Sequence, residues 1–372
     1  MTLQTISRAL VSFVCASTLF SHCATAEILV GQSAGFTGGQ ASYSKDVRDG
    51  ILACFAAVNR AGGIEGQQLK LLAEDDEGKR DQVVANTKKL IEKDNVFALI
   101  GYTSGAGTEA ALPVAEAARV PMLSPASGNM GIRARHHRYL FHTRAGYADE
   151  MRYIVDTTAA IGLSRYALVY LFDAAVNLPA MEGALKANNL TSVASVGIDR
   201  NAKDFGQVVD NLLAAKPDAV LFITNGPPLA EIVRGMKKSG YVGEFISSSF
   251  AGTKMIEDLK DDAIGLKVVQ VLPSPKKNYV RLIKEYREHL RQADANATPN
   301  YTSLEGYVAA RVLAEGLRRT GKNPTRERFV AVLETFRRVD LGGYEISFSP
   351  INHNGSRFVE IGVVNLAKNL AF

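Results

Sequence analysis

Two loops of small and hydroxyl-bearing residues are the parts of this chain best suited to bind a solute. Residues 101–108 (GYTSGAGT) follow an apolar run that ends at Ile100, and residues 124–129 (SPASGN) follow another that ends at Leu123. Free amides at the start of a helix, beside the Ser104 hydroxyl, suit a carboxylate. An ordinary strand-to-helix turn explains the first loop equally well, because it lacks the glycine spacing and the lysine of nucleotide-binding motifs. Two such loops after neighbouring strands favour one shared site.

The other side chains that could do chemistry are better explained as parts of the structure. His136, His137 and His142 lie among four arginines that would repel a cation, and no cysteine or carboxylate with zinc spacing is near them. The paired acids at 75–76 are expected to cap the helix that follows. Cys54 lies in an apolar helical stripe, which predicts a buried, unreactive thiol. The chain also lacks a nucleophile elbow, so we expect no catalytic residue, no metal and no cofactor.

The segment 49–91 shows how the elements around the two loops are built. An apolar face at helical spacing begins at Ile51 and Leu52, and the glycines of the turn at 61–63 end that helix. An apolar run at 69–72 predicts a strand, and a second amphipathic helix follows the two acids. This alternation predicts a parallel sheet, and ligands of such sheets bind at the carboxyl ends of the strands.

The alternation starts again in the second half of the chain. Further strands are expected at 166–171, 192–198, 219–223, 244–248 and 264–272, with helices between them. Three helices are then predicted at 279–291, 303–319 and 325–338. Two closing segments, at 344–348 and 358–365, are expected to form a terminal strand pair. The sequence therefore predicts an α/β protein with two doubly wound lobes whose strand ends face a common cleft.

The first residues have the three parts of a secretory signal. Arg8 precedes the apolar stretch 9–20, and an Ala-x-Ala sequence ends at Ala26. We expect cleavage after Ala26 and export, rather than a buried N-terminal helix. Lipid attachment at Cys23 is disfavoured by His22, because lipoprotein processing needs a small residue there. One cysteine then remains, so no internal disulfide is expected.

Length and charge narrow the class of protein. A chain of 372 residues is longer than one compact core usually holds, which favours two lobes. The net charge of +5 is mild and the basic residues are scattered, so nucleic-acid binding is not expected. No apolar run after the signal is long enough to cross a bilayer.

Several motifs match one family. They are VGQS at 30–33, VNRAGGIEG at 58–66, the acids at 75–76, ALIG at 98–101, SP at 124–125 and GMKKSG at 235–240. With these motifs the chain closely resembles periplasmic solute-binding proteins of the branched-chain amino acid (leucine/isoleucine/valine-binding) type, which supply ABC importers. The resemblance implies the type I periplasmic binding protein fold, in which two lobes close on a ligand about a three-crossing hinge. It implies no enzymatic activity.

The resemblance also implies which residues of the first lobe contact the ligand. In this family a carboxylate is held by the loops after the third and fourth strands, largely through backbone amides. Those positions here are Ser104, Gly105, Ala126, Ser127 and Gly128. An aromatic residue early in the first helix often packs on the ligand, and Tyr43 occupies that place.

The second lobe departs from the amino acid binders, which hold the ligand ammonium with a tyrosine and a glutamate. Asn225 and Ser249 occupy those two places. The family often carries a tyrosine-glycine pair after the first strand of this lobe, and here Ala175 and Val176 replace it. A buried ammonium without an anionic partner is costly. We therefore expect a carboxylate or amide solute that need not carry an ammonium group.

The sequence thus predicts the periplasmic substrate-binding component of an ABC importer. It would act as a monomer, capture a small amino acid, carboxylate or amide by hinge closure, and deliver it to a membrane permease. The expected lobes are 27–145 with 275–357, and 146–274 with 358–372. A ligand-sensing regulatory protein of the same fold is the alternative, and the signal peptide favours transport.

Overall fold

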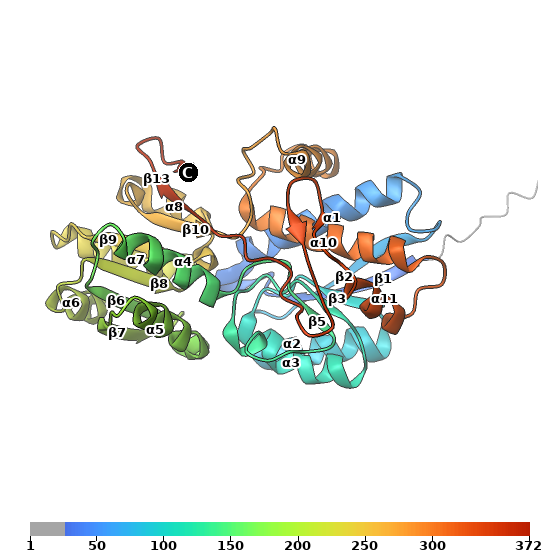
Figure 1. The fold of residues 1–372 in the computed structure, drawn as a ribbon, viewed down its shortest axis with the longest axis horizontal. Coiled ribbons are helices and arrows are strands. Elements are labelled where there is room, and N and C mark those ends of the chain that lie inside the picture. Colours follow the sequence, from blue (N-terminus) through green and yellow to red (C-terminus); the bar gives the residue numbers. More distant parts are fainter. Residues whose placement is uncertain (1–26) are drawn as a thin grey trace, which may run out of the picture.

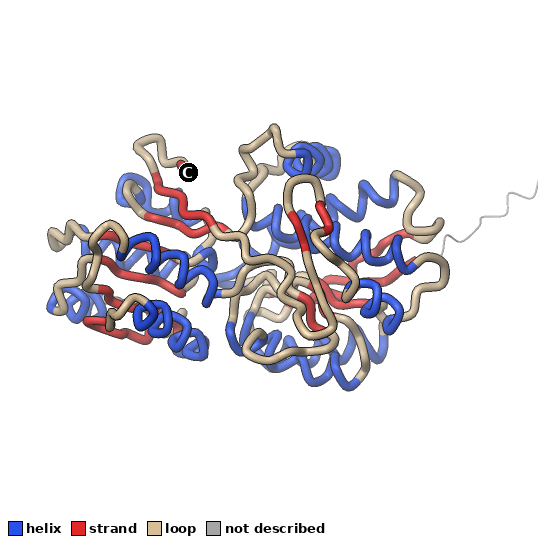
Figure 2. Tube along the Cα trace, viewed as in Figure 1, coloured by secondary structure: helices blue, strands red, loops and turns tan. Residues whose placement is uncertain are grey.

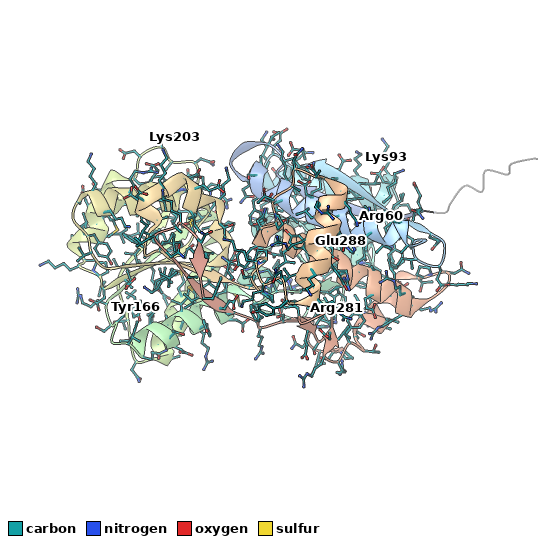
Figure 3. The ribbon with its side chains drawn as sticks, turned by 90° about the horizontal axis from the view of Figure 1, so that it is seen from above. Arg60, Lys93, Tyr166, Lys203, Arg281 and Glu288 are labelled. Carbon is teal, nitrogen blue, oxygen red and sulfur yellow. The ribbon has the colours of Figure 1, made fainter. Side chains whose placement is uncertain are left out.

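The computed structural model describes residues 27–372 and contains two lobes, each built around one sheet (Figure 1). The expected signal peptide and its cleavage site after Ala26 lie outside the described residues. The predicted α/β class with two doubly wound sheets is confirmed. Figure 3 shows the same two bodies from above, with Tyr166 and Lys203 in one and Arg60, Arg281 and Glu288 in the other.

The first sheet has five parallel strands in the order β2-β1-β3-β4-β5. They are β1 (Glu27–Ala34), β2 (Gln68–Asp75), β3 (Ala98–Ile100), β4 (Met122–Leu123) and β5 (Leu140–Phe141). Almost every residue of β1, β3, β4 and β5 is buried, as expected for strands covered on both faces. The strand order reverses direction beside β1, and the loops after β3 and β4 leave the sheet at the same edge.

Helices cover both faces of the first sheet. One face carries α1 (Ala41–Arg60), α9 (Arg281–Ala293), α10 (Tyr301–Thr320) and α11 (Arg326–Leu333), and the other carries α2 (Arg80–Lys88) and α3 (Gly105–Ala117). Two glycines allow α1 and α10 to touch. A Cβ at Gly50 would lie 1.8 Å from the Ser303 carbonyl oxygen, and one at Gly306 would lie 2.0 Å from that of Val47. The last third of the chain thereby completes the core that the first third begins.

The second sheet repeats the order of the first. Its strands run β14-β13-β10-β9-β8-β6-β7, and the five from β7 to β10 are parallel. They are β6 (Tyr166–Leu171), β7 (Ser192–Ile198), β8 (Ala219–Ile223), β9 (Glu244–Ser247) and β10 (Lys267–Gln270), with β13 (Glu360–Val364) and β14 (Leu370–Ala371) added antiparallel. One face is covered by α4 (Tyr147–Ala159) and α5 (Leu178–Ala187), and the other by α6 (Gly206–Ala214), α7 (Gly226–Lys238) and α8 (Lys254–Leu259).

The chain passes between the two sheets three times, from β5 to α4, from β10 to α9 and from β12 to β13 (Figure 2). The hydroxyl of Tyr344 ties the first two passages together. It lies 2.7 Å from the Thr143 carbonyl oxygen and 3.3 Å from that of Val271. These passages lie close to the predicted lobe boundaries, and hinge motion about them stays a prediction.

Two expectations about the ends of elements are wrong. The closing segments do not pair with each other, because β12 (Glu345–Ile346) pairs with β11 (Val339–Asp340) and β13 instead covers the open edge of β10. An unpaired edge strand exposes backbone groups, so β13 gains more hydrogen bonds there. The acids at 75–76 do not cap α2, which begins at Arg80. Asp75 accepts hydrogen bonds from the amides of residues 36 and 77 instead, at 2.9 Å each.

In helix α1, one residue differs from expectation and another agrees with it. Leu52 is 40% exposed, although Ile51 beside it is fully buried, so the apolar face of α1 is narrower than the sequence indicates. Cys54 is a buried free thiol as predicted, and burial raises its pKa to about 12, which keeps it protonated and unreactive.

Candidate functional site

The first predicted loop becomes the start of helix α3. The helix begins at Gly105, inside the predicted loop, because Ser104 caps it: its Oγ accepts a hydrogen bond of 3.0 Å from the Gly107 amide. The Gly105 amide has no hydrogen-bond partner within residues 27–372. A free amide at a helix start and a hydroxyl that can still donate are the groups that hold an anion.

The second loop packs directly against the first. A Cβ at Gly105 would lie 2.8 Å from the Ser127 hydroxyl, and one at Gly128 would lie 2.5 Å from the Tyr147 ring, so both positions need glycine. The Ala126 amide donates to the Tyr102 carbonyl at 2.8 Å and is not free for a ligand, contrary to expectation. The Gly128 amide makes no hydrogen bond to the backbone within residues 27–372, but it lies against the Tyr147 hydroxyl.

Arg133 fixes the shape of the second loop. Its guanidinium donates to the Ser127 carbonyl at 3.1 Å and to the Arg144 carbonyl at 3.2 Å. Burial, and after it the nearby Arg144, lower the pKa of Arg133 to about 9. This arginine had no assigned role in the sequence, because nothing in its spacing shows that it reaches back to the loop.

The two loops border a small cavity of about 20 Å³. The first lobe contributes Ser104, Gly105 and Ser127 to its lining, and the second contributes Ala174, Asn177, Arg200 and Phe250. Arg200 is paired with Asp173 at 2.7 Å. The cavity wall is therefore rich in hydroxyl, amide and guanidinium donors. Ala175 is exposed and is not among the lining residues, and its neighbour Ala174 takes that place.

A larger cavity of about 360 Å³ lies on the other side of Phe250, and both cavities share Phe250 and Gln40. Tyr43 and Asn225 line it, as the ligand prediction requires of them. The Tyr43 hydroxyl donates to the Ala126 carbonyl at 3.0 Å, which connects this cavity to the second loop. The Asn225 Oδ1 atom is covered and has no hydrogen-bond partner within residues 27–372.

A buried ionic network joins the two lobes beside these cavities. Arg144, on the first passage between the sheets, lies 2.6 Å from Glu150 of α4 and 3.3 Å from Glu305 of α10. Ser249, in the second lobe, donates to Glu150 from its amide and its hydroxyl at 2.8 Å each, and Arg144 also donates to the Ser249 hydroxyl. Arg144, Glu150 and Glu305 are all at least nine-tenths buried.

The electrostatics of the network follow from its burial. Burial alone would lower the pKa of Arg144, but Glu305 and Glu150 raise it above its ordinary value. Burial raises the pKa of Glu150, although Arg144 and Ser249 oppose that shift. Ser249, which takes the place of a glutamate in the resembled amino acid binders, therefore itself contacts a buried glutamate. Glu305 had a detectable signal, since it is a charged residue within the apolar pattern of the predicted helix 303–319.

The lobes also touch at the rim of the cleft. The Met130 amide of the first lobe donates to Asn177 Oδ1 of the second at 2.9 Å. Nearer the first passage, the Tyr147 amide donates to the Gly128 carbonyl at 2.8 Å. A ligand group that enters the small cavity would therefore be enclosed by both lobes.

Fold and cleft together define a two-lobed binding protein of the type I periplasmic class. A family model described as periplasmic binding protein matches residues 27–368, so the chain belongs to that family of non-enzymatic, ABC-transporter solute-binding proteins. It is similar to an amino acid binding protein of Pseudomonas aeruginosa, 25% identical over 305 residues that cover 81% of this chain and 80% of the relative.

Two solved structures show the same fold. A substrate-binding periplasmic protein from Ralstonia solanacearum is 30% identical with a TM-score of 0.87, and the match covers 92% of this chain and 99% of that one. A possible leucine/isoleucine/valine-binding protein from Rhodopirellula baltica is 23% identical with a TM-score of 0.89, over 94% and 97% of the two chains. Within residues 27–372, no helix combines the length and apolar character that crossing a membrane requires.

Proposed function

We propose that the protein is the periplasmic solute-capturing component of an ABC importer. It binds a small amino acid, or a related carboxylate or amide, between its lobes, closes about the three passages and presents the closed form to a membrane permease. The relatives named as amino acid binding proteins favour this class of solute. A ligand oxygen would meet Ser104 and the amides of Gly105 and Gly128.

One observation carries the proposal. Donors from the loops after β3 and β4 face residues of the second lobe across a cavity, at the carboxyl ends of strands in both sheets. Parallel α/β sheets bind ligands at these ends, and a site shared by two lobes couples binding to closure.

Thermal unfolding against a panel of solutes tests the proposal. The panel contains the twenty amino acids, their amides, the corresponding acids without the amino group, and aromatic acids. A true ligand at about a hundredfold above its Kd adds about 2.7 kcal/mol to the free energy of unfolding. Ser104→Asp should remove that gain, because it places a carboxylate where the ligand carboxylate would lie. A panel without any stabilising member would contradict the proposal.

The periplasmic location has a separate test. Mass spectrometry of the protein recovered from the periplasm of an expressing bacterium should show Glu27 as the first residue. A lipid-modified Cys23 at the N-terminus, or an uncleaved chain retained in the cytoplasm, would overturn the proposed location.

A further inference from the structure

The buried ionic network carries more negative than positive charge. The carboxylates of Glu150 and Glu305 share the single guanidinium of Arg144, and all three side chains are at least nine-tenths buried. Arg133, a half-buried cation nearby, donates to two backbone carbonyls and to Asn354 rather than to these acids, and its Nε has no partner within residues 27–372. A buried excess of charge is costly unless a further cation compensates it.

The two carboxylates differ in how well they are satisfied. Glu150 accepts three short hydrogen bonds, of 2.6 Å from Arg144 and 2.8 Å from each of the two Ser249 donors. Within residues 27–372, Glu305 is held only by Arg144 Nη1, at 3.3 and 3.4 Å. Charge-assisted hydrogen bonds usually measure about 2.7–2.9 Å, so Glu305 keeps capacity to accept from another donor.

Glu305 faces the cleft. It lines a space of about 10 Å³ together with Tyr43, Ser249, Gly252 and Thr302. Tyr43, Gly252 and Thr302 also line the 360 Å³ cavity, so this space is a side pocket of that cavity. A group of the ligand that enters this side pocket would meet the buried carboxylate of Glu305.

The two cavities of the cleft differ in the charge of the residues that line them. The small cavity beyond Phe250 is lined by hydroxyls, amides and Arg200, and by no carboxylate. The larger cavity is lined by Asp46, Glu257 and Asp258 against the single cation Lys254. Tyr43 connects the larger cavity to the second loop, because its hydroxyl bonds Ala126 of that loop while its ring borders the side pocket of Glu305.

We propose that Glu305 is the anionic partner of a positively charged group on the ligand, an inference that rests on the proposed function. The solute is then a zwitterion. Its carboxylate lies at Ser104 and Gly128, and its amine lies against Glu305 beside Tyr43. Arg144 and Glu150 are positioning residues, which hold Glu305 and Ser249 in place without touching the solute. The anion that the second lobe lacks at Asn225 is supplied from α10 of the first lobe.

Matched ligand pairs test this assignment by calorimetry. The pairs are L-leucine with 4-methylpentanoate, L-phenylalanine with 3-phenylpropanoate, and 4-aminobutanoate with butanoate. In the wild type, the amine-bearing member of at least one pair should bind about tenfold tighter or more than its partner. Glu305→Gln should abolish that preference by weakening the amine-bearing member alone. Glu315→Gln is the matched control, because Glu315 lies on the same helix and pairs with Arg319 outside the cleft.

A second variant covers the case in which Glu305→Gln does not fold. Thr302 lies one helical turn before Glu305 and lines both spaces. Thr302→Lys would place a tethered ammonium beside Glu305 and should also abolish the preference for the amine.

The outcomes separate the two proposals. Equal affinity within every pair in the wild type, or a preference that survives Glu305→Gln, would overturn the role of Glu305 and leave solute capture standing. If the folded wild-type protein bound none of the six solutes in the three pairs, the role of Glu305 would be refuted. Stabilisation by another panel solute would still support capture in that case, and an unresponsive panel would remove both.

Discussion

At the residue scale, glycine at position 128 is required by close contact rather than by backbone conformation. A Cβ there would lie 2.5 Å from the Tyr147 ring and 2.8 Å from the Tyr147 amide nitrogen. Gly128→Ala should therefore lower the free energy of unfolding by about 1–3 kcal/mol and weaken ligand binding, since the loop must move. Gly183→Ala is the control, because no atom lies within 4 Å of its Cβ position. Urea unfolding and calorimetry measure both effects, and an unchanged Gly128→Ala protein would refute the packing argument.

Buried histidines make stability depend on pH. Burial lowers the pKa of His142 well below its usual value, and the nearby Arg133 lowers it further. The unfolded chain, with a histidine pKa of about 6.5, then binds more protons than the folded one below that pH. His142 should therefore cost the fold up to about 1.4 kcal/mol for each pH unit below about 6.5.

The measurement is urea unfolding of the wild type and His142→Gln between pH 8 and pH 5. Glutamine keeps a donor for the Ile132 carbonyl, which His142 Nε2 contacts at 3.2 Å, and does not titrate. The difference between the two proteins isolates His142 from Asp46 and Glu150, whose raised pKa values act in the opposite direction. If the free energies of unfolding of the two proteins changed with pH in the same way, His142 would be protonated as easily in the folded state as in the unfolded state.

At the element scale, the start of α3 serves both stability and binding. Ser104→Ala removes the hydrogen bond to the Gly107 amide and should lower the free energy of unfolding by about 1 kcal/mol. Ser104→Asp keeps a capping oxygen and favours the positive helix end, so stability should be retained while carboxylate binding is lost. If Ser104→Ala and Ser104→Asp both lowered the free energy of unfolding and the ligand affinity in the same proportion, Ser104 would act only as a helix cap.

The helices and strands themselves were largely predictable from the sequence. Which strands pair with each other in the sheets was only partly predictable. The ranges of β6 and β8 agree with the apolar runs, because strands buried on both faces leave a continuous apolar signal. The pairing of β13 with β10 was not predictable, because hydrogen bonding to an open sheet edge leaves no local pattern.

The site was predictable only where it is local in sequence. Ser104, Gly105 and Ser127 meet in one cavity, as two small-residue loops on adjacent parallel strands must. The contact between Arg144 and Glu305 spans 161 residues of the chain, and no spacing rule connects them. Buried ionic partners on distant elements are therefore the part of this site that only a structure supplies.

At the scale of the whole molecule, closure should be sensitive to the contact at the rim. Asn177→Ala removes the hydrogen bond from the Met130 amide, which joins the lobes. Because this bond exists only when the lobes meet, its loss should weaken ligand affinity about two- to tenfold. Small-angle scattering should show a smaller radius of gyration for the wild type with its stabilising solute than without it.

The control for this variant is Asn188→Ala, whose side chain bonds Asp156 within one lobe at 2.7 Å. It should leave both affinity and closure unchanged. An Asn177→Ala protein with wild-type affinity would show that the rim contact is not part of the closed, ligand-bound form.

The order of the chain through the two lobes sets the order in which they can fold. The first sheet needs α10 and α11 to cover it, and Arg326 reaches the Val96 carbonyl across 230 residues of the chain. The strands β6 to β10 of the second sheet are contiguous in sequence. Distant contacts slow folding, because a long loop must close before any contact compensates its entropy. The first lobe of a newly made chain therefore cannot complete its core until the last third is present, whereas the five parallel strands of the second lobe are all available earlier.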